Sequence, residues 1–244
     1  MNNTQTLEQL RSLRLTGMYD YYKQMLNMPA HEHPDAHQLI AMLAQSENLW
    51  RTNRKTERYI KQARFRYSAA LESIDYHPDR YLDKTTVQAL ADCSFIDRGE
   101  NILITGATGC GKSYMATALG QQACSLGYKS LYVSMPKLTE QVLSSRADAS
   151  YQKLILRLAK PDVLILDDFG LSPVDQNMRL TILQILEDRY EYKSLIITSQ
   201  LPFNTWYEYI GEPTLADAIM DRMSAKAHHI ELQGHSLRKK TLKK

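Results

Sequence analysis

The hydrophobic pattern begins with two stretches of helical periodicity near the N-terminus. Apolar residues recur at helical spacing over residues 7–27 and again from about residue 35 to residue 66. Pro29 separates the two stretches, because proline has no backbone N–H to continue a helix. The pattern predicts a small all-α domain, which we place at residues 1–67.

Short apolar runs and helical stretches alternate through the rest of the chain. A short helical pattern covers residues 83–91, before the first run. The runs lie at residues 101–105, 130–134, 163–166, 195–199 and 229–232, and the stretches between them at 114–126, 137–160, 175–192 and 217–223. Polar residues 144–150 interrupt the second of these stretches. Strands that alternate with helices predict an α/β domain over residues 68–244, with a parallel sheet covered by helices on both faces.

Composition agrees with two domains and indicates the cellular compartment of the protein. The chain has 244 residues, of which 43% are hydrophobic, enough for one larger and one smaller core. Three cysteines, at positions 93, 110 and 124, are too few for a disulfide framework and favour a reducing compartment. No apolar run reaches the length of a membrane span, and the N-terminus lacks the apolar core of a secretory signal. We therefore expect a cytoplasmic protein with no membrane partner.

Positive charge is concentrated in one helical stretch, although the net charge is only +3. Residues 51–66 contain seven basic residues against one acid, interleaved with aromatic residues. Such clusters suit double-stranded DNA, because neutralised phosphates release counterions. The DNA-binding candidates here are Arg51, Arg54, Lys55, Arg58 and Lys61. A solvated helix face is the alternative, and for the basic tail at 238–244 a disordered tail is equally compatible.

A phosphate-binding motif follows the apolar run at 101–105. Residues 106–113 fill every fixed place of the pattern G-x-x-x-x-G-K-[S/T], and a helical stretch follows. The candidate nucleotide-binding residues are Gly106, Ala107, Thr108, Gly109, Cys110, Gly111, Lys112, Ser113 and Tyr114. Lys112 is expected to reach the β- and γ-phosphates of ATP, and Ser113 to bind Mg²⁺. A glycine-rich turn without function does not explain Lys112 and Ser113.

Two acids end the apolar run at 163–166. Carboxylates at the end of a buried strand are costly unless they meet a cation, and α/β sheets place ligands at these ends. We therefore expect Asp167 to hold Mg²⁺ and Asp168 to orient or activate the attacking water. The alternative is an acidic cap between strand and loop.

Polar groups also end the run at 195–199. Gln200 is our candidate for contacting the γ-phosphate and the attacking water, because an amide can donate and accept hydrogen bonds. Thr198 and Ser199 are close alternatives, and an ordinary strand end is the competing interpretation.

These motifs together resemble a known family. The chain is similar, from about residue 5 to 238, to the IstB-like transposition helper ATPases, which belong with the DnaC-type helicase loaders to the initiator branch of AAA+ ATPases. The resemblance rests on residues 106–113, 167–170, 197–202, 217–223 and 234–238 in this order.

The resemblance implies an AAA+ P-loop ATPase that uses ATP and Mg²⁺ and forms oligomers with nucleotide between subunits. It implies a regulator of transposition, a form of DNA recombination, that assembles on target DNA and recruits or stimulates the transposase of its insertion sequence. Arg222 would then be the arginine finger for a neighbouring subunit, with an ordinary surface arginine as the alternative. The helical stretch 136–160 would face DNA and adds Lys137, Arg146, Lys153 and Arg157 as candidate contacts. A sensor role for Arg238 stays open, because a full C-terminal lid is absent.

Two other functions remain. A DnaC-type helicase loader would share the motor and differ in its partner. A small-molecule P-loop kinase would need an acceptor pocket and an arginine-rich mobile lid, and the sequence shows neither.

Overall fold

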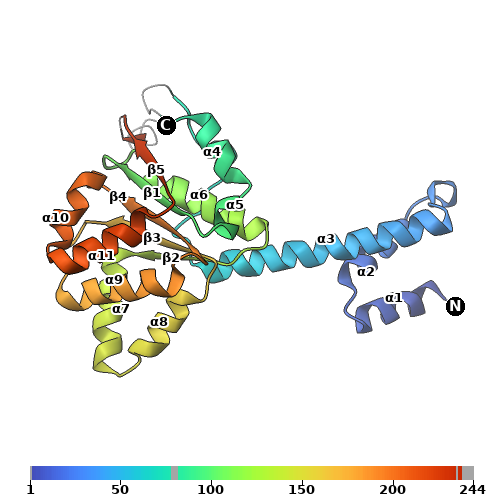
Figure 1. Cartoon of the computed structure of the whole chain (residues 1–244). Coiled ribbons are helices and arrows are strands. Elements are labelled where there is room, and N and C mark those ends of the chain that lie inside the picture. Colours follow the sequence, from blue (N-terminus) through green and yellow to red (C-terminus); the bar gives the residue numbers. More distant parts are fainter. Residues whose placement is uncertain (1, 78–81, 235, 238–244) are drawn as a thin grey trace. The chain divides into compact units, whose positions relative to one another are not determined.

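The computed structural model describes residues 2–77, 82–234, 236 and 237 (Figure 1). The chain forms two compact units, residues 1–58 and 59–244, which divide inside helix α3 (Ala36–Ala63). The sequence pattern placed its boundary later, after residue 67. Arg238 and the rest of the basic tail lie outside the described residues.

The first unit contains more helices than the sequence pattern predicted. The single helix expected over residues 7–27 is wrong: the structure has α1 (Asn3–Ser12) and α2 (Thr16–Met25), followed by the short turn η1 (Ala30–Glu32). Arg14 adopts a left-handed conformation, with φ of 57°, which ends one helix before the next begins.

A close approach of α2 to α3 explains Gly17. A Cβ atom at this position would lie 2.3 Å from the carbonyl oxygen of Ser46, so only glycine fits. The buried carboxylate of Glu47 accepts hydrogen bonds from the backbone N–H groups of Gly17 and Met18, at 2.8 and 3.3 Å. Glu47 therefore satisfies the otherwise unpaired start of α2.

The second unit is built on a five-stranded parallel sheet, as the alternating pattern predicted. Its strands are β1 (Asn101–Gly106), β2 (Ser130–Ser134), β3 (Val163–Phe169), β4 (Ser194–Ser199) and β5 (Ala227–Leu232). They lie in the order β2-β3-β4-β1-β5, and all neighbouring pairs are parallel. β4 therefore separates β1 from β3.

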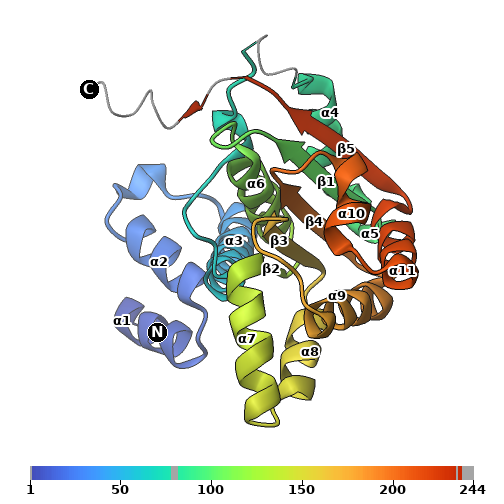
Figure 2. The ribbon, with the colours of Figure 1, turned by 90° about the vertical axis from the view of Figure 1, so that its left-hand side faces the viewer.

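Helices cover both faces of this sheet (Figures 1 and 2). One face carries α4 (Lys84–Ala91), α5 (Ser94–Asp97) and α6 (Lys112–Ser125). The other carries α7 (Met135–Ala147), α8 (Tyr151–Ala159), α9 (Gln176–Arg189), α10 (Trp206–Ile210) and α11 (Pro213–Ser224). The short turns η2 (Leu71–Ser73) and η4 (Phe203–Thr205) complete the unit.

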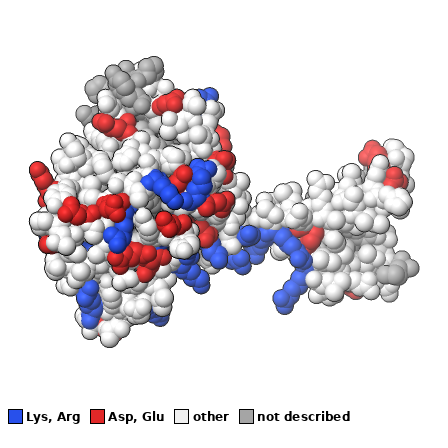
Figure 3. Space-filling view, in the orientation of Figure 1, with Lys and Arg blue, Asp and Glu red and all other residues white. Residues whose placement is uncertain are grey.

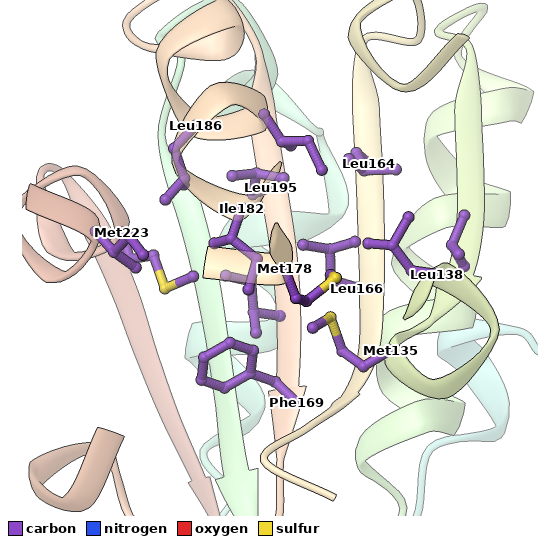
Figure 4. Close-up of a cluster of buried hydrophobic side chains, with 14 of the residues drawn as sticks. Met135, Leu138, Leu164, Leu166, Phe169, Met178, Ile182, Leu186, Leu195 and Met223 are labelled. Atoms are coloured by element: carbon purple, nitrogen blue, oxygen red, sulfur yellow. The ribbon is translucent and has the colours of Figure 1, made fainter. Parts of the chain in front are cut away.

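Alternate residues of each strand supply the two hydrophobic cores. Leu164 and Leu166 of β3 pack with Met178 and Ile182 of α9 on one face (Figure 4), whereas Ile165 packs on the α6 face. Successive side chains of a strand point to opposite faces, so a strand between two helical layers must be apolar throughout. This is why the sequence shows unbroken apolar runs.

Two further observations concern composition. Cys93, Cys110 and Cys124 are all buried and form no disulfide bond. Within the described residues, no helix combines the length and apolarity needed to cross a membrane.

Candidate functional site

The loop between β1 and α6 has the backbone that its glycines predict. Gly106, Gly109 and Gly111 have φ values of 142°, 84° and 98°, a region that other residues rarely adopt. At Gly106 a Cβ atom would lie 2.0 Å from the carbonyl oxygen of Leu232, so a side chain is excluded by space as well. The loop leads into the N-terminus of α6, where unpaired N–H groups and the helix dipole favour an anion.

Lys112 is held at the first position of α6. Its side chain is 6% exposed, and its Nζ donates a hydrogen bond to the carbonyl oxygen of Ala107 at 2.9 Å. The lysine side chain is thus folded back onto the loop, and the residue also lines the cavity described below. Cys110 is buried in the core under the loop.

Asp167 is fully buried and is the centre of a hydroxyl network. Ser113 Oγ donates a hydrogen bond to Asp167 Oδ1 at 2.8 Å, and Thr198 donates to the same oxygen. Tyr132 of β2 donates to Oδ2, and burial together with this contact raises the pKa of the tyrosine. The network connects α6 with three adjacent strands. Sequence reasoning missed Tyr132, which lies inside an apolar run.

A bulge in β3 separates the two acids. Leu166 pairs with Ile197 and Phe169 pairs with Ser199, so β3 has one residue more than β4 over this interval. Asp168 occupies the bulge with φ of 63°, and its N–H donates to Thr198 Oγ1 at 3.1 Å. Asp167 consequently points into the protein, whereas the Asp168 side chain is half-buried and lines the cavity above the loop.

The end of β4 distinguishes the three polar candidates. Thr198 and Ser199 are fully buried, and Ser199 Oγ donates to the carbonyl oxygen of Phe169 at 2.6 Å. Gln200 is exposed, and its Oε1 accepts a hydrogen bond from Thr108 Oγ1 of the phosphate loop at 2.6 Å. Of the three, Gln200 is therefore the one that faces the loop.

A cavity of about 470 Å³ lies over the loop. It brings together most of the predicted residues: Thr108, Gly109, Gly111, Lys112, Ser113, Tyr114, Asp168 and Gln200. It also contains four residues that sequence reasoning did not place there: Arg66, Tyr67, Leu171 and Leu237.

Two segments distant in sequence explain part of these additions. Tyr67 stacks on Tyr114, with ring centroids 6.2 Å apart, and the N–H of Leu237 donates to the carbonyl oxygen of Gly109 at 3.0 Å. Arg66 and Tyr67 belong to the basic and aromatic cluster that we assigned to DNA, and no sequence signal connects them to the loop.

A smaller cavity adjoins the loop on its other side. It measures about 110 Å³ and is lined mainly by apolar groups, among them Ile74, Leu82 and Met115. Gly111, Tyr114 and Leu237 line it too, so it is next to the start of α6.

The structure does not bring Arg222 to this site. Arg222 lies in α11, and its backbone carbonyl accepts a hydrogen bond from the Asn101 side chain, at the first residue of β1. The phosphate loop follows the last residue of that strand, about 17 Å away at the usual rise per residue. The Arg222 side chain forms an ion pair with Glu187 at 3.1 Å. Arg222 is therefore near the amino end of β1, whereas Lys112 follows its carboxyl end.

The DNA-binding candidates occupy two surfaces. Lysine and arginine side chains gather along α3 (Figure 3), where Arg51, Arg54, Lys55, Arg58 and Lys61 are exposed. Arg51 pairs with Glu47 at 2.7 Å, and Arg54 lies over the ring of Trp50. Lys137 and Lys153 line a groove between α7 and α8, while Arg146 stacks on Tyr151 with 4.4 Å from guanidinium carbon to ring centre.

Magnesium has suitable ligands at one place. The Ser113 hydroxyl and the Asp167 carboxylate are adjacent oxygen donors beside the loop. Within the described residues, no group of three or more His, Cys, Asp or Glu side chains could hold a metal ion. Mg²⁺ usually takes only one or two carboxylates and completes its shell with water and substrate phosphates, so Ser113 and Asp167 fit this ion.

The position of β4 defines the class of protein. A strand with a polar end inserted between the strand before the phosphate loop and the strand before the acids is the arrangement of the AAA+ P-loop proteins, and the chain has this fold. It belongs to the family described as IstB-like ATP binding protein, whose model matches residues 8–244.

Two relatives extend over most of the chain. "Putative insertion sequence ATP-binding protein y4pL" of Sinorhizobium fredii is 39% identical over 98% of this chain and 98% of its own. "Insertion sequence IS1162 putative ATP-binding protein" of Pseudomonas fluorescens is 40% identical over 84% of this chain and 89% of its own.

Solved structures agree on the fold. A structure of DnaI has a TM-score of 0.60 at 22% identity, covering 72% of this chain and 94% of that one. The DnaC helicase loader has a TM-score of 0.59 at 19% identity, covering 72% of this chain and 99% of its own. At these identities the likeness concerns the fold alone.

Proposed function

We propose that the chain is an ATP-hydrolysing, DNA-binding regulator of transposition, which oligomerises on duplex DNA and recruits or stimulates the transposase of its insertion sequence. The observation that carries this proposal is the union of a P-loop site with near full-length similarity to insertion sequence ATP-binding proteins.

Nucleotide binding in this proposal uses the two cavities at the loop. The backbone N–H groups and Lys112 hold the phosphates in the larger cavity, because both are donors aimed at an anion. The smaller, apolar cavity near Ile74 and Met115 suits the planar base. Tyr114 lines both cavities and lies between phosphate and base.

Hydrolysis in this proposal needs a base and a charge-stabilising group. Ser113 and Asp167 would hold Mg²⁺, which supplies neutralisation of the phosphate charge when bound. Asp168 accepts the proton of the attacking water, since its carboxylate lines the cavity while Asp167 is engaged in three hydrogen bonds. Gln200 orients that water or the γ-phosphate.

The position of Arg222 supports oligomerisation. It cannot reach Lys112 of its own chain, so a role as arginine finger requires a second copy arranged head to tail. An arginine from one copy would then complete the site of the next and stabilise transition-state charge.

Two basic surfaces support binding to DNA. The residues on α3 are spaced along one helix, and Lys137 and Lys153 line the groove between α7 and α8. Their charges suit phosphate contacts without base recognition, so we expect binding with little sequence preference.

A helicase loader is the second candidate, because the DnaC structure has the same fold. One experiment distinguishes the transposition regulator, the helicase loader and the small-molecule kinase. ATP turnover is measured with and without duplex DNA, and strand transfer by the transposase of its insertion sequence is measured with and without the protein. DNA-stimulated turnover together with ATP-dependent strand transfer supports transposition. The transposition proposal is contradicted if DNA stimulates turnover but the protein loads a helicase and does not affect strand transfer. It is also contradicted if the protein transfers phosphate from ATP to a metabolite. Lys112→Ala is the negative control.

A further inference from the structure

We propose that a backbone phosphate of duplex DNA binds in a second cavity, beside β2, and that Arg66 and Asp168 transmit this binding to the nucleotide. This inference rests on the proposed function and names the place where DNA regulates ATP hydrolysis. We call the space the β2 cavity; it is formed by Arg64, Arg66, Leu131, Tyr132, Val133, Ser134, Lys137, Gln141, Arg157 and Asp168.

The β2 cavity is a distinct space with a strongly positive wall. It measures about 270 Å³, several times the roughly 30 Å³ that one water molecule occupies in the liquid. Arg64, Arg66, Lys137 and Arg157 contribute four cations, and Asp168 contributes the one carboxylate of the lining. The cations come from three separate segments, which the fold brings together at the edge strand of the sheet.

The four cations of this cavity outnumber the carboxylate of Asp168 in its lining. Across the part of the chain that the structure describes, Arg64, Arg66, Lys137 and Arg157 form no ion pair, whereas Arg98 and Arg222 each pair with a glutamate. Arg157 donates instead to the neutral amide of Gln141, at 2.5 Å. Burial and the nearby charge of Arg64 lower the pKa of Arg157. An anion bound here would relieve this repulsion.

The shape favours a chain of phosphates over an isolated anion. The β2 cavity continues into the groove between α7 and α8, a further space of about 560 Å³, and the two share Lys137, Gln141 and Arg157. Lys153 is on the wall of the groove, and so are the carboxylates of Glu140 and Asp148. Cations spaced along a continuous groove can follow a nucleic-acid backbone, whereas a single phosphate needs only one of them.

Two residues connect the β2 cavity with the nucleotide. Arg66 and Asp168 line both the β2 cavity and the cavity over the phosphate loop. Asp168 sits on the bulge of β3, so its side chain is placed by the local backbone and by Thr198. A phosphate that attracts Arg66 changes the electrostatic environment of the catalytic candidate Asp168. We therefore expect DNA to increase the rate of hydrolysis and not merely to tether the protein.

The test separates affinity for DNA from stimulation by DNA. Lys137→Gln and Arg157→Gln are compared with the wild type in full-length protein, measuring duplex affinity and ATP turnover over a DNA titration. We expect the ratio of turnover at saturating DNA to turnover without DNA to fall roughly tenfold, as for removal of a charge-assisted hydrogen bond. Lys160→Gln, at the end of α8 and outside both spaces, should leave that ratio unchanged. Thermal unfolding of each variant checks that it is folded.

The α3 surface supplies a second comparison. Replacing Arg54, Lys55 and Arg58 should weaken DNA binding yet leave the ratio at saturating DNA intact, because these residues do not line the β2 cavity. Equal ratios in the wild type and in both β2-cavity variants would overturn this inference and leave the proposed function standing. If DNA does not change ATP turnover by the wild type, both this inference and the proposed function are overturned. Equal stimulation by inorganic phosphate or duplex RNA would overturn the assignment to DNA.

Discussion

Ser113 Oγ lies 2.8 Å from Asp167 Oδ1 and donates a hydrogen bond to it, which joins the first turn of α6 to the end of β3. The Ser113 hydroxyl of the phosphate loop thus contacts the buried carboxylate, and the Thr198 hydroxyl donates a hydrogen bond to the same oxygen. Asp167 is therefore committed to the network, and the neighbouring Asp168 is the carboxylate that lines the cavity over the phosphate loop.

Asp168→Asn is expected to slow ATP hydrolysis by about 10²–10⁴-fold, because it removes the proposed base. Asparagine tolerates the left-handed backbone at this position, so folding and nucleotide affinity should stay close to wild type. Single-turnover hydrolysis and nucleotide titration measure the two effects. Loss of nucleotide binding in this variant would contradict the assignment.

Arg222→Ala and Lys112→Ala should each abolish DNA-stimulated turnover, and mixing the two proteins should restore part of it. The reason is that Arg222 and Lys112 lie near opposite ends of β1 and would act in the same site only across two copies, so a mixed pair can contain one complete site. Turnover is measured over a range of mixing ratios. Glu187→Gln, which removes only the ion-pair partner of Arg222, is the matched control and should keep its activity. Mixtures no more active than their components would argue against a shared site.

Replacing Arg54, Lys55 and Arg58 together with Gln should lower duplex DNA affinity and its dependence on salt. For each phosphate that the protein no longer neutralises, the slope of log K against log salt becomes shallower by about 0.9. Fluorescence anisotropy at several salt concentrations gives both values. Arg11, Arg14 and Lys23 offer a control with equal charge loss in the same unit. An unchanged slope would remove α3 from the DNA-binding surface.

Glu100 should contribute to stability in a defined pH range. Two hydrogen bonds from Arg98 and one contact with His228 lower its pKa from 4.5 to about 2. The contribution is complete above pH 4.5, where the carboxylate is ionised in both states, and is lost as the pH falls to about 2. Urea unfolding should show a steeper loss between these values for the wild type than for Glu100→Gln. Glu208→Gln is the control, and equal slopes for wild type and Glu100→Gln would refute the contribution.

The sequence predicted the larger architecture because that architecture depends on local patterns. Apolar runs identified all five strands, and the glycine pattern identified the phosphate loop. The prediction from hydrophobic periodicity failed where a single residue changes the backbone direction. Arg14 adopts a left-handed conformation and divides the first predicted helix, and the hydrophobic pattern contains no signal for such a residue. The order of the strands is also absent from periodicity, and only the structure gives it.

The candidate site was predictable only in part for a related reason. Motif residues such as Lys112 and Asp168 occur in contiguous patterns, whereas Tyr132, Arg66 and Leu237 reach the site from distant segments. Tyr132 resembles any strand residue in the sequence, and only the pairing of β2 with β3 brings its hydroxyl to Asp167. Arg66 was counted only as part of the basic cluster at residues 51–66, although it also lines the cavity over the phosphate loop.

The separation of Arg222 from the phosphate loop gives any head-to-tail row of copies two unlike ends. Under the proposed function, every interior copy receives an arginine from its neighbour, while one terminal copy keeps a site that nothing completes. Turnover per copy would then rise with the length of an open row and level off, whereas a closed ring would reach its full rate at one size. The dependence of turnover on protein concentration and DNA length therefore reports whether the assembly closes.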